Sequence, residues 1–258
     1  MRKRILYVFL VVVAVTSLLA SVFTVASRSK DTGPAVNIDY PTIAAHRGGK
    51  ALHPENTLTA FKTTAENHPG MPLEMDVMAL KDGTLVLSHD TTVDRVAVNA
   101  TGKVADMTRT QWARLRIKHP NGGAPAPAST LDEVVTEFED TNTPLVIELK
   151  APTAIDQFTE TLWPIKDQVI VQSFDTKIAS RLARSGLHTL QLSGELPDPI
   201  VKGVEHVGIS NKNVTKQFVD NAHNQGVKVW VWGDDVTASM LDTDTRGVDG
   251  FIANNPER

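Results

Sequence analysis

Cysteine is absent from the 258-residue chain. This absence excludes a disulfide framework, a thiolate metal site and a cysteine nucleophile. A bound metal ion would therefore depend on carboxylates and histidines for its protein ligands. The absence does not decide the compartment, because a protein without cysteine can fold on either side of a membrane.

The sequence also has no basic stripe beyond its first four residues, and its net charge is −4. Nucleic-acid-binding proteins normally carry such a stripe, so we expect no nucleic-acid partner. Hydrophobic residues make up 41% of the chain, which is enough for one domain with a substantial core. No internal repeat or low-complexity segment stands out.

One long hydrophobic run, residues 5–26, follows three basic residues at the amino end. About 20 apolar residues can cross a bilayer as a helix, and the basic end should stay in the cytoplasm. The rest of the chain is then expected to be extracytoplasmic, whether the run is a retained membrane anchor, which we favour, or a signal peptide cleaved after Ala26. The predicted boundaries are 1–26 for the anchor or signal peptide, 27–40 for a polar linker and 41–258 for the remaining domain.

Short β-rich segments alternate with helical patterns from Pro41 onward. This alternation predicts a parallel sheet with helices packed outside it. The predicted strands cover 42–46, 73–80, 84–90, 144–150, 168–174, 189–193, 205–210, 227–232 and 248–254, and the predicted helices cover 57–67, 109–116, 130–139, 153–163, 175–185, 214–225 and 237–245.

The sequence KDGT at 81–84 separates two of these strands. Asp-Gly supplies the positive φ angles of a two-residue hairpin, so 73–80 and 84–90 should run antiparallel. Eight parallel strands remain, the number that closes a (β/α)8 (TIM) barrel. An open doubly wound sheet is the competing fold, but no glycine-rich dinucleotide loop follows the first strand. The long connection 91–143 is interpreted as an elaboration over the barrel mouth.

Two carboxylates, Glu74 and Asp76, lie in an otherwise apolar strand. Residues two apart in a strand point to the same face, so both side chains are aimed together. A water-facing strand edge is the alternative interpretation, but the apolar neighbours indicate a strand buried on both sides. Buried acids are costly without a cation beside them, which favours a metal site.

Glu148 and Lys150 repeat this arrangement at the end of the apolar segment 144–150, although the exposed end of a strand would also explain them. A third carboxylate would complete a site rich in oxygen ligands. Such a site suits Ca²⁺ or Mg²⁺ better than zinc, which prefers histidine and thiolate.

His89 is placed by the expected register of the hairpin. With a two-residue turn at Asp82 and Gly83, His89 should lie directly opposite Asp76, with the two Cβ atoms about 5 Å apart. Apart from His46, the remaining histidines are expected to be ordinary surface residues; they are His53, His68, His119, His188, His206 and His223.

His46 and Arg47 end the first strand, and barrel active sites lie at the carboxyl ends of the strands. The acids, the histidines and the cations should therefore converge there. Two imidazoles can take and give protons on opposite sides of one reacting group, while Arg47 and Lys150 suit an anionic tetrahedral oxyanion. Together with a metal ion, this combination indicates phosphoryl chemistry. Glycoside hydrolysis also uses paired carboxylates, but it needs neither the two histidines nor the two cations.

The motifs together resemble those of the glycerophosphodiester phosphodiesterase family over residues 42–257. The family's HRG…PENT appears here as HRGGKALHPENT, and its ExD…KDG…HD appears as EMDVMALKDGTLVLSHD. The segments DTTVDRVAVNATGKVADMT, STLDEVV, IELK, VQSFD and VDGFIANNP follow in the family's order. The resemblance implies a (β/α)8 barrel that hydrolyses glycerophosphodiesters to an alcohol and glycerol 3-phosphate.

The resemblance also implies roles for the residues at matching positions. The implied site consists of His46 and His89 as the acid–base pair, Glu74, Asp76 and Glu148 as ligands of Ca²⁺ or Mg²⁺, and Arg47, Lys150 and Glu55 near the phosphate. Glu55 would hold Arg47 or approach the metal. In the implied course, the substrate's own glycerol hydroxyl attacks phosphorus and gives a cyclic phosphate, which water then opens.

The chain departs from the family pattern near its end. VWVWGDD stands where the family commonly has W-T-V-N, and IANNP stands where it often has I-T-D-Y-P. Trp230 and Trp232 share one face of their strand, so one of them, for which we choose Trp232, could line the glycerol side of the pocket. Packing in the core is an equally good interpretation. The departures leave the substrate's identity open but not the chemistry.

Three functions follow from these patterns. The first is a membrane-anchored or exported glycerophosphodiesterase acting on a small molecule. The second is a lysophospholipase D-like or phospholipase C-like lipid phosphodiesterase on the same fold, against which the aromatic content of 5% and the lack of an apolar lid both argue. The third, a non-catalytic module that binds a cation or a wall polymer, would show erosion of a site position, and none is eroded. Membrane contact is expected through the amino-terminal helix if it is not cleaved.

Overall fold

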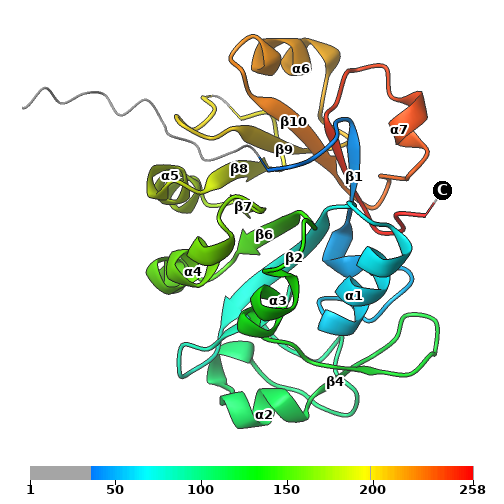
Figure 1. Ribbon diagram of the computed structural model, residues 1–258, viewed down its shortest axis with the longest axis vertical. Helices are drawn as coiled ribbons and strands as arrows, with labels where there is room; N and C mark the ends of the chain where they lie inside the picture. Colours follow the sequence, from blue (N-terminus) through cyan, green and yellow to red (C-terminus); the bar gives the residue numbers. More distant parts are fainter. Residues whose placement is uncertain (1–35, 198, 258) are drawn as a thin grey trace, which may run out of the picture. The chain divides into compact units, whose positions relative to one another are not determined.

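The computed structural model describes residues 36–197 and 199–257, and within them eight parallel strands close into a barrel. The first strand pairs with both the second and the last, which completes the ring and confirms the predicted (β/α)8 fold (Figure 1). The barrel strands are β1 (Thr42–Ala45), β2 (Leu73–Ala79), β6 (Leu145–Leu149), β7 (Val169–Ser173), β8 (His188–Ser193), β9 (His206–Ser210), β10 (Lys228–Trp232) and β11 (Gly250–Ala253).

Helices surround the barrel, and several begin at a side chain that caps them (Figure 1). Thr57 and Thr130 each accept a hydrogen bond from a backbone N–H of the first turn, and Asp175 accepts two. No helix forms between β8 and β9 in the described residues 194–197 and 199–205. The α-helices are α1 (Leu58–Asn67), α2 (Arg109–Arg114), α3 (Leu131–Phe138), α4 (Ile155–Leu162), α5 (Thr176–Ser185), α6 (Lys216–His223) and α7 (Met240–Thr243), and the 3₁₀ turns are η1 (His46–Gly48), η2 (Val104–Asp106), η3 (Pro152–Ala154) and η4 (Trp163–Ile165).

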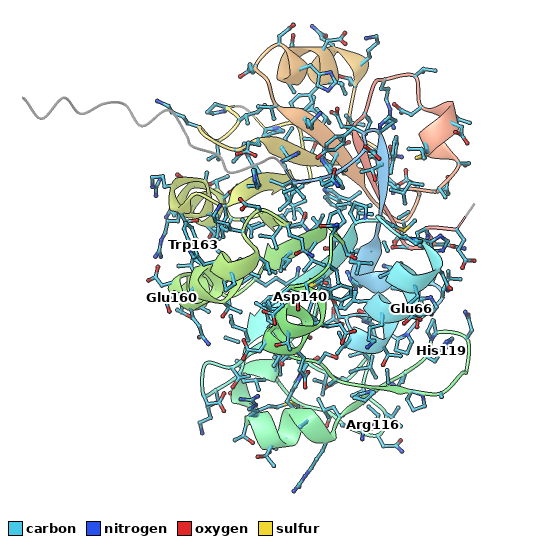
Figure 2. All side chains as sticks on the ribbon, in the orientation of Figure 1. Glu66, Arg116, His119, Asp140, Glu160 and Trp163 are labelled. Atoms are coloured by element: carbon cyan, nitrogen blue, oxygen red, sulfur yellow. The ribbon has the colours of Figure 1, made fainter. Side chains whose placement is uncertain are left out.

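Charged side chains on the helices point away from the barrel. Figure 2 labels Glu66 on α1, Glu160 on α4 and Asp140 just after α3, and all three are exposed. The opposite faces of the helices pack on the strands, for example through Phe158 and Leu162 of α4, which are fully buried. This division between polar and apolar faces is what attaches the helices to the barrel wall.

Trp230 fills the barrel interior and does not line a pocket. Its side chain is fully buried in a cluster with Ile170, Leu190 and Ile252. Gly250 lies beside it in the register, where an added Cβ atom would come within 2.2 Å of the indole ring. The absence of a side chain at Gly250 therefore provides the space for Trp230, and core packing is the correct interpretation for this tryptophan.

The connection after β2 forms a small unit with its own core. It contains β3 (Leu85–Leu87), β4 (Arg116–Ile117), β5 (Ala126–Pro127) and α2, and in Figure 1 α2 and β4 lie beneath α1 and α3. Trp112 is buried among its apolar side chains and donates a hydrogen bond to the carbonyl of Ser129 at 3.1 Å. Val86 of β3 belongs to the same cluster, which ties the elaboration to the hairpin.

The amino end of the barrel is closed by residues that directly precede β1. Val36 is buried against the barrel interior, so residues 36–40 of the predicted linker pack on the domain. The Tyr40 hydroxyl lies 3.0 Å from His206 Nε2, and Lys228 Nζ lies 4.1 Å from the centre of the Tyr40 ring. The predicted anchor at 1–26 lies outside the described residues. Among the residues that the structure describes, no helix is long and apolar enough to cross a membrane.

Two histidines assigned to the surface are buried, so that prediction is wrong for them. His188 is 4% exposed and His206 is 6% exposed. Both begin barrel strands, where the imidazole covers the amino end of the core. A polar partner compensates each ring, Glu205 for His188 at 2.6 Å and Tyr40 for His206. Neither partner is adjacent in sequence, so the residue pattern alone does not predict the burial.

We expect His206 to make the folded protein less stable in mild acid. Burial lowers the pKa of His206 from 6.5 to about 4, so between these values the unfolded chain binds a proton that the folded protein does not. The free energy of unfolding should therefore rise with pH across this window, by about 3 kcal/mol from His206 alone. Chemical denaturation of His206→Gln should show a smaller rise, whereas His119→Gln, on the outer loop in Figure 2, should match the wild type. An unchanged pH dependence in His206→Gln would contradict the prediction.

Candidate active site

A pocket of about 250 Å³ opens at the carboxyl ends of the barrel strands. Seven of the nine predicted site residues line it, while Lys150 and Glu55 contact lining residues from behind. The predicted residues in the lining are His46, Arg47, Glu74, Asp76, His89, Glu148 and Trp232, and they are joined by Lys50, Gln172, Phe174, Leu192, Gly233, Asp234 and Ile252.

Three buried carboxylates form the floor of the pocket. Glu74, Asp76 and Glu148 each offer an oxygen, and these oxygens all lie within 4.8 Å of one another. The parallel register of β2 and β6 sets Asp76 beside Glu148, and Glu74 is two residues earlier on the same face as Asp76. Their exposed fractions are 3%, 1% and 6%, so β2 and β6 carry these acids inside the protein, as predicted for Glu74 and Asp76 from their apolar neighbours.

Burial and mutual repulsion separate the pKa values of these carboxyls. Burial, together with the charges of Asp76 and Glu148, raises the pKa of Glu74 well above its usual range. Burial and Asp76 likewise raise the pKa of Glu148 to about 7. Burial would raise the pKa of Asp76 too, but the positive charges of Arg47 and Lys150 outweigh it and lower that pKa to about 2. Lys150 Nζ lies 3.3 Å from Asp76 Oδ1 and 3.0 Å from Glu148 Oε2.

Arg47 is held in a turn that aims it into the cluster. Its backbone φ is +51°, an unusual value for a residue with a side chain, and its backbone N–H donates to Glu74 Oε2 at 2.9 Å. The guanidinium donates to Glu55 at 3.0 Å and lies 3.2 Å from Asp76. Gly48 follows at φ +79°, where a Cβ atom would come within 2.9 Å of the Phe61 ring. The glycine in HRGG therefore lets α1 approach the turn closely.

His46 lies beside the carboxylates, with Nδ1 in hydrogen-bond contact and Nε2 near Glu74 but beyond hydrogen-bond distance. Nδ1 is 2.6 Å from Asn254 Oδ1, and Nε2 is 3.8 Å from Glu74 Oε2. Burial and the adjacent Arg47 charge lower the pKa of His46 to about 4. The imidazole is therefore neutral near pH 7 and can accept a proton.

His89 lines the same pocket, but the predicted hairpin register is wrong by one residue. Val77 pairs with Leu87, and the N–H of Ser88 donates to the carbonyl of Asp76, so Ser88 occupies the place predicted for His89. The loop has three residues, because Leu80 N–H bonds to the carbonyl of Thr84. Gly83 takes φ +86°, as in a three-residue hairpin with a bulge. His89 reaches the pocket from just beyond β3, in the segment that leads into the elaboration.

A series of charged side chains connects His89 to Arg47 on the rim. His89 Nδ1 is 2.7 Å from Asp90, and Arg95 Nε donates to Asp90 at 2.6 Å. Arg95 also donates two hydrogen bonds to Glu55, at 2.6 and 2.8 Å, and Glu55 in turn accepts from Arg47. Glu55 thus holds Arg47, which is one of its two predicted roles, and it is not among the three clustered carboxylates.

Several residues that shape the site were not predicted. Asn56 donates to Asp76 Oδ2 at 2.8 Å and accepts from the Asp76 N–H at 3.1 Å. Gln172 Nε2 donates to Glu74 Oε1 at 2.9 Å. Asn56 lies within PENT and Gln172 within VQSFD, so their presence in shared motifs was the only available signal. Arg95 and Asn254 also lie in segments of the family pattern, DTTVDRVAVNATGKVADMT and VDGFIANNP, but in loops without periodicity.

The opposite wall of the pocket is apolar. Phe174 and Trp232 meet edge to face with ring centres 5.4 Å apart, and Leu192 and Ile252 lie in the same lining. Phe174 is 46% exposed, which is unusual for a large aromatic ring. The pocket therefore has one side for charge and another for carbon chains.

The described residues fit a divalent cation. Three carboxylates with adjacent oxygens form a set of hard ligands. Gln172 Oε1 is buried and has no hydrogen-bond partner, although an orphaned buried oxygen costs about 1–3 kcal/mol. Its amide is oriented by Glu74, so a free carbonyl oxygen remains in the pocket lining. A cation, a substrate hydroxyl or water would satisfy this oxygen.

Comparison with known proteins places the chain among phosphodiesterases. Residues 46–258 match the glycerophosphoryl diester phosphodiesterase family. A glycerophosphodiester phosphodiesterase of Caldanaerobacter subterraneus is 29% identical over 231 residues, which cover 83% of this chain and 94% of the relative. A phosphodiesterase of Oleispira antarctica, solved in complex with the product sn-glycerol-3-phosphate, superposes with a TM-score of 0.71 at 21% identity, over 84% of this chain and 94% of the other. A glycerophosphodiester phosphodiesterase of Agrobacterium tumefaciens gives a TM-score of 0.68 at 20% identity, over 83% and 97%.

Proposed function

Because the chain belongs to the glycerophosphoryl diester phosphodiesterase family, we propose that it hydrolyses glycerophosphodiesters to glycerol 3-phosphate and an alcohol. The observation that carries this proposal is the pocket in which His46, His89 and Arg47 meet three buried carboxylates. A volume of about 250 Å³, just below the usual range for ligand pockets, favours a small substrate. The Oleispira relative binds sn-glycerol-3-phosphate, the product that this reaction would release.

We propose that Glu74, Asp76 and Glu148 hold a divalent cation, Ca²⁺ or Mg²⁺. When bound, the cation would neutralise charge that develops on the phosphoryl oxygens. Arg47 lines the pocket and would add a forked donor for the phosphate, and Lys150 would add a point charge behind the carboxylates. Without the cation the three carboxylates repel one another and a phosphate. With the cation bound, the site would attract an anion.

The surroundings of the two histidines support different roles for them. His46 is neutral, so its Nε2 can take the proton of the attacking glycerol hydroxyl as the new P–O bond forms. His89 donates through Nδ1 to the Asp90 carboxylate, which orients its ring, and His89 would protonate the leaving alkoxide as its P–O bond breaks. The cyclic phosphate is then opened by water with the roles reversed. His46 returns its proton to the ring oxygen that leaves, and His89 takes one from the water.

The apolar wall supports a lipid substrate as the second candidate. Phe174 and Trp232 present exposed aromatic surface at the mouth, where an acyl chain of a lysophospholipid could lie. The cavity itself is too small to enclose such a chain, so the acyl group would stay on the surface. A glycerophosphodiester without an acyl chain remains the first choice.

A panel of substrates tests the proposed function. We expect the protein to release glycerol 3-phosphate from glycerophosphocholine, glycerophosphoethanolamine or glycerol-phosphate oligomers, in a coupled assay with glycerol-3-phosphate dehydrogenase. A chelator should abolish release, and Ca²⁺ or Mg²⁺ should restore it, because the carboxylates alone repel a phosphate. Turnover of lysophosphatidylcholine in preference to glycerophosphocholine would favour the lipid candidate. Full activity in the chelator would contradict the cation proposal.

We also propose that the barrel acts outside the cytoplasm. The support is the basic residues at 2–4 followed by the apolar run at 5–26, which would leave the barrel on the far side of the membrane. Fractionation of the producing cells, with protease added to intact spheroplasts, tests this location. Protection of the barrel from protease would contradict it.

A further inference from the structure

Three side chains form a hydrogen-bonded chain along the rim of the pocket, above neighbouring strands. His46 directly follows β1, Asn254 directly follows β11, and Asp234 lies two residues beyond β10. His46 Nδ1 lies 2.6 Å from Asn254 Oδ1, and Asn254 Nδ2 donates to Asp234 Oδ1 at 3.0 Å. The register pairs Ala45 with Ala253, which brings His46 and Asn254 to the same level of the barrel.

We propose that Asn254 and Asp234 are positioning residues that orient the His46 ring, with Nδ1–H donated to Asn254 and the lone pair of Nε2 left for the pocket. This inference rests on the proposed function, in which Nε2 of His46 is the base. An Nδ1–H that donates to Asn254 leaves the lone pair of Nε2 free on the side of Glu74 and the pocket. The opposite tautomer would place a hydrogen on Nε2 and make it unable to accept the substrate's proton.

The carboxylate of Asp234 determines which group donates and which accepts in both hydrogen bonds of this series. A carboxylate only accepts hydrogen bonds, so the NH₂ group of the Asn254 amide must face Asp234. The amide oxygen then faces His46, and Nδ1 must carry a hydrogen to donate to it. A reversed amide would set its oxygen against the carboxylate and its NH₂ group against Nδ1–H. Asp234 thus determines the tautomer of His46 through the orientation of the Asn254 amide, without contacting His46 itself.

Neighbouring contacts hold Asn254 and Asp234 in this arrangement. The Asn254 carbonyl accepts from the Ala51 N–H at 3.0 Å, which fixes its backbone against the turn after His46. Lys50 Nζ lies 3.5 Å from Asp234 Oδ1 and favours the ionised carboxylate. Asp234 is otherwise 91% exposed, so substitutions there should not disturb packing. Asp234 and Asn254 belong to VWVWGDD and IANNP, the two stretches where the chain departs from the family pattern.

The tautomer can be measured directly by ¹⁵N NMR of the full chain labelled at histidine, without reference to turnover. The signals of His46 are assigned by their loss in His46→Gln. We expect a protonated Nδ1 and an unprotonated Nε2 in the wild type and in Asn254→Asp, which keeps an acceptor for Nδ1–H. Asn254→Leu removes the acceptor at similar volume and should move the hydrogen to Nε2. Asp234→Ala, which cannot threaten the fold, should give a mixture because the amide becomes free to reverse.

Kinetics then separate positioning from a structural role. Asn254→Leu should lower kcat by roughly 10–100-fold, the usual range for a residue that orients a functional ligand, with KM unchanged. Asp234→Ala should lower kcat by a few fold, about 2–5-fold by the same reasoning. Asn254→Asp should recover much of the loss. Asp235→Ala is the matched control, since this neighbouring carboxylate bonds to Asn211 and is not in the pocket lining.

Each outcome has a separate meaning. A wild-type His46 protonated on Nε2, or an unchanged tautomer in both Asn254→Leu and Asp234→Ala, would overturn the inference. A tautomer that moves without any loss of kcat would overturn the positioning role. If the tautomers respond as expected but the wild type hydrolyses none of the substrate panel, the proposed function fails while the assignment of the ring stands.

Discussion

His46→Ala and His89→Ala are each expected to lower kcat for glycerol 3-phosphate release by roughly 10²–10⁴-fold, the contribution of a positioned acid or base. Each substitution removes one of the two histidines in the pocket lining to which we assign a proton transfer. Neither side chain belongs to the apolar core, because His46 is 22% exposed and His89 is 37% exposed. The variants should therefore remain folded, and circular dichroism and thermal melting can check this.

The double variant gives the sharper result. If both imidazoles serve one reaction sequence, His46→Ala combined with His89→Ala should be little worse than the poorer single variant, because groups that act as a unit are not additive. His119→Ala provides the control, since His119 lies on the outer loop in Figure 2 and is not in the pocket lining. Near-normal turnover in either single variant would refute the acid–base assignment. A multiplicative loss in the double variant would indicate two independent roles.

A substrate with a good leaving group should tell the acid from the base. A nitrophenyl ester of glycerol phosphate leaves as a stable anion, so its departure depends little on a proton donor. We expect this substrate to recover much of the activity of His89→Ala and little of the activity of His46→Ala. The reverse pattern would exchange the two roles without affecting the rest of the proposal.

The barrel could be predicted from the sequence because its strands carry a local signal. Apolar segments such as 144–150 and 168–174 have the length and composition of buried parallel strands, and the structure places β6 and β7 within them. The same locality explains why Glu74 and Asp76 could be assigned to one face. The period of a strand is fixed by backbone geometry and does not depend on the rest of the fold.

The register of the hairpin could not be predicted in the same way. Asp82-Gly83 fits a two-residue turn as well as a three-residue turn with Gly83 in the left-handed conformation, and the difference shifts every partner by one position. His89 nevertheless reaches the pocket, because the segment beyond β3 bends toward it and Asp90 is held by Arg95. His89 was thus placed in the pocket through an incorrect pairing.

Contacts between loops account for the other features of the site that the sequence did not predict. Asn254 reaches His46 only because the last strand pairs with the first, and Arg95 reaches Glu55 only after the elaboration has folded. Such contacts join residues separated by 208 and 40 positions. The periodicity of the residue pattern gives no signal for such long-range contacts. The burial of His188 and His206 was missed for the same reason, since their partners come from segments packed across the barrel's amino end.

Glu148→Gln is expected to abolish cation binding and turnover while leaving the cation-free protein at least as stable as the wild type. The substitution removes one of three buried carboxyl groups whose negative charges repel one another when ionised, and burial with the charge of Asp76 already raises the pKa of Glu148 to about 7. Loss of a ligand oxygen charge should weaken the affinity for Ca²⁺ or Mg²⁺ by more than about 100-fold, the upper end of the cost of losing an outer partner. Calorimetric titration and thermal melting with and without cation measure both effects.

In Glu148→Gln the affinity for the cation should fall, whereas the stability of the cation-free protein should not. A general disruption of the fold would lower both. Wild-type protein should gain about 2.7 kcal/mol at a cation concentration of 100 times Kd, whereas Glu148→Gln should gain almost nothing at the same concentration. Cation affinity of the wild type should also fall as the pH drops below about 7, because the proton on Glu148 must leave before the carboxylate can bind. Glu160→Gln, at the exposed position on α4 labelled in Figure 2, should match the wild type. Equal stabilisation of Glu148→Gln and wild type by the cation would show that the ion binds elsewhere and that the buried trio has another purpose.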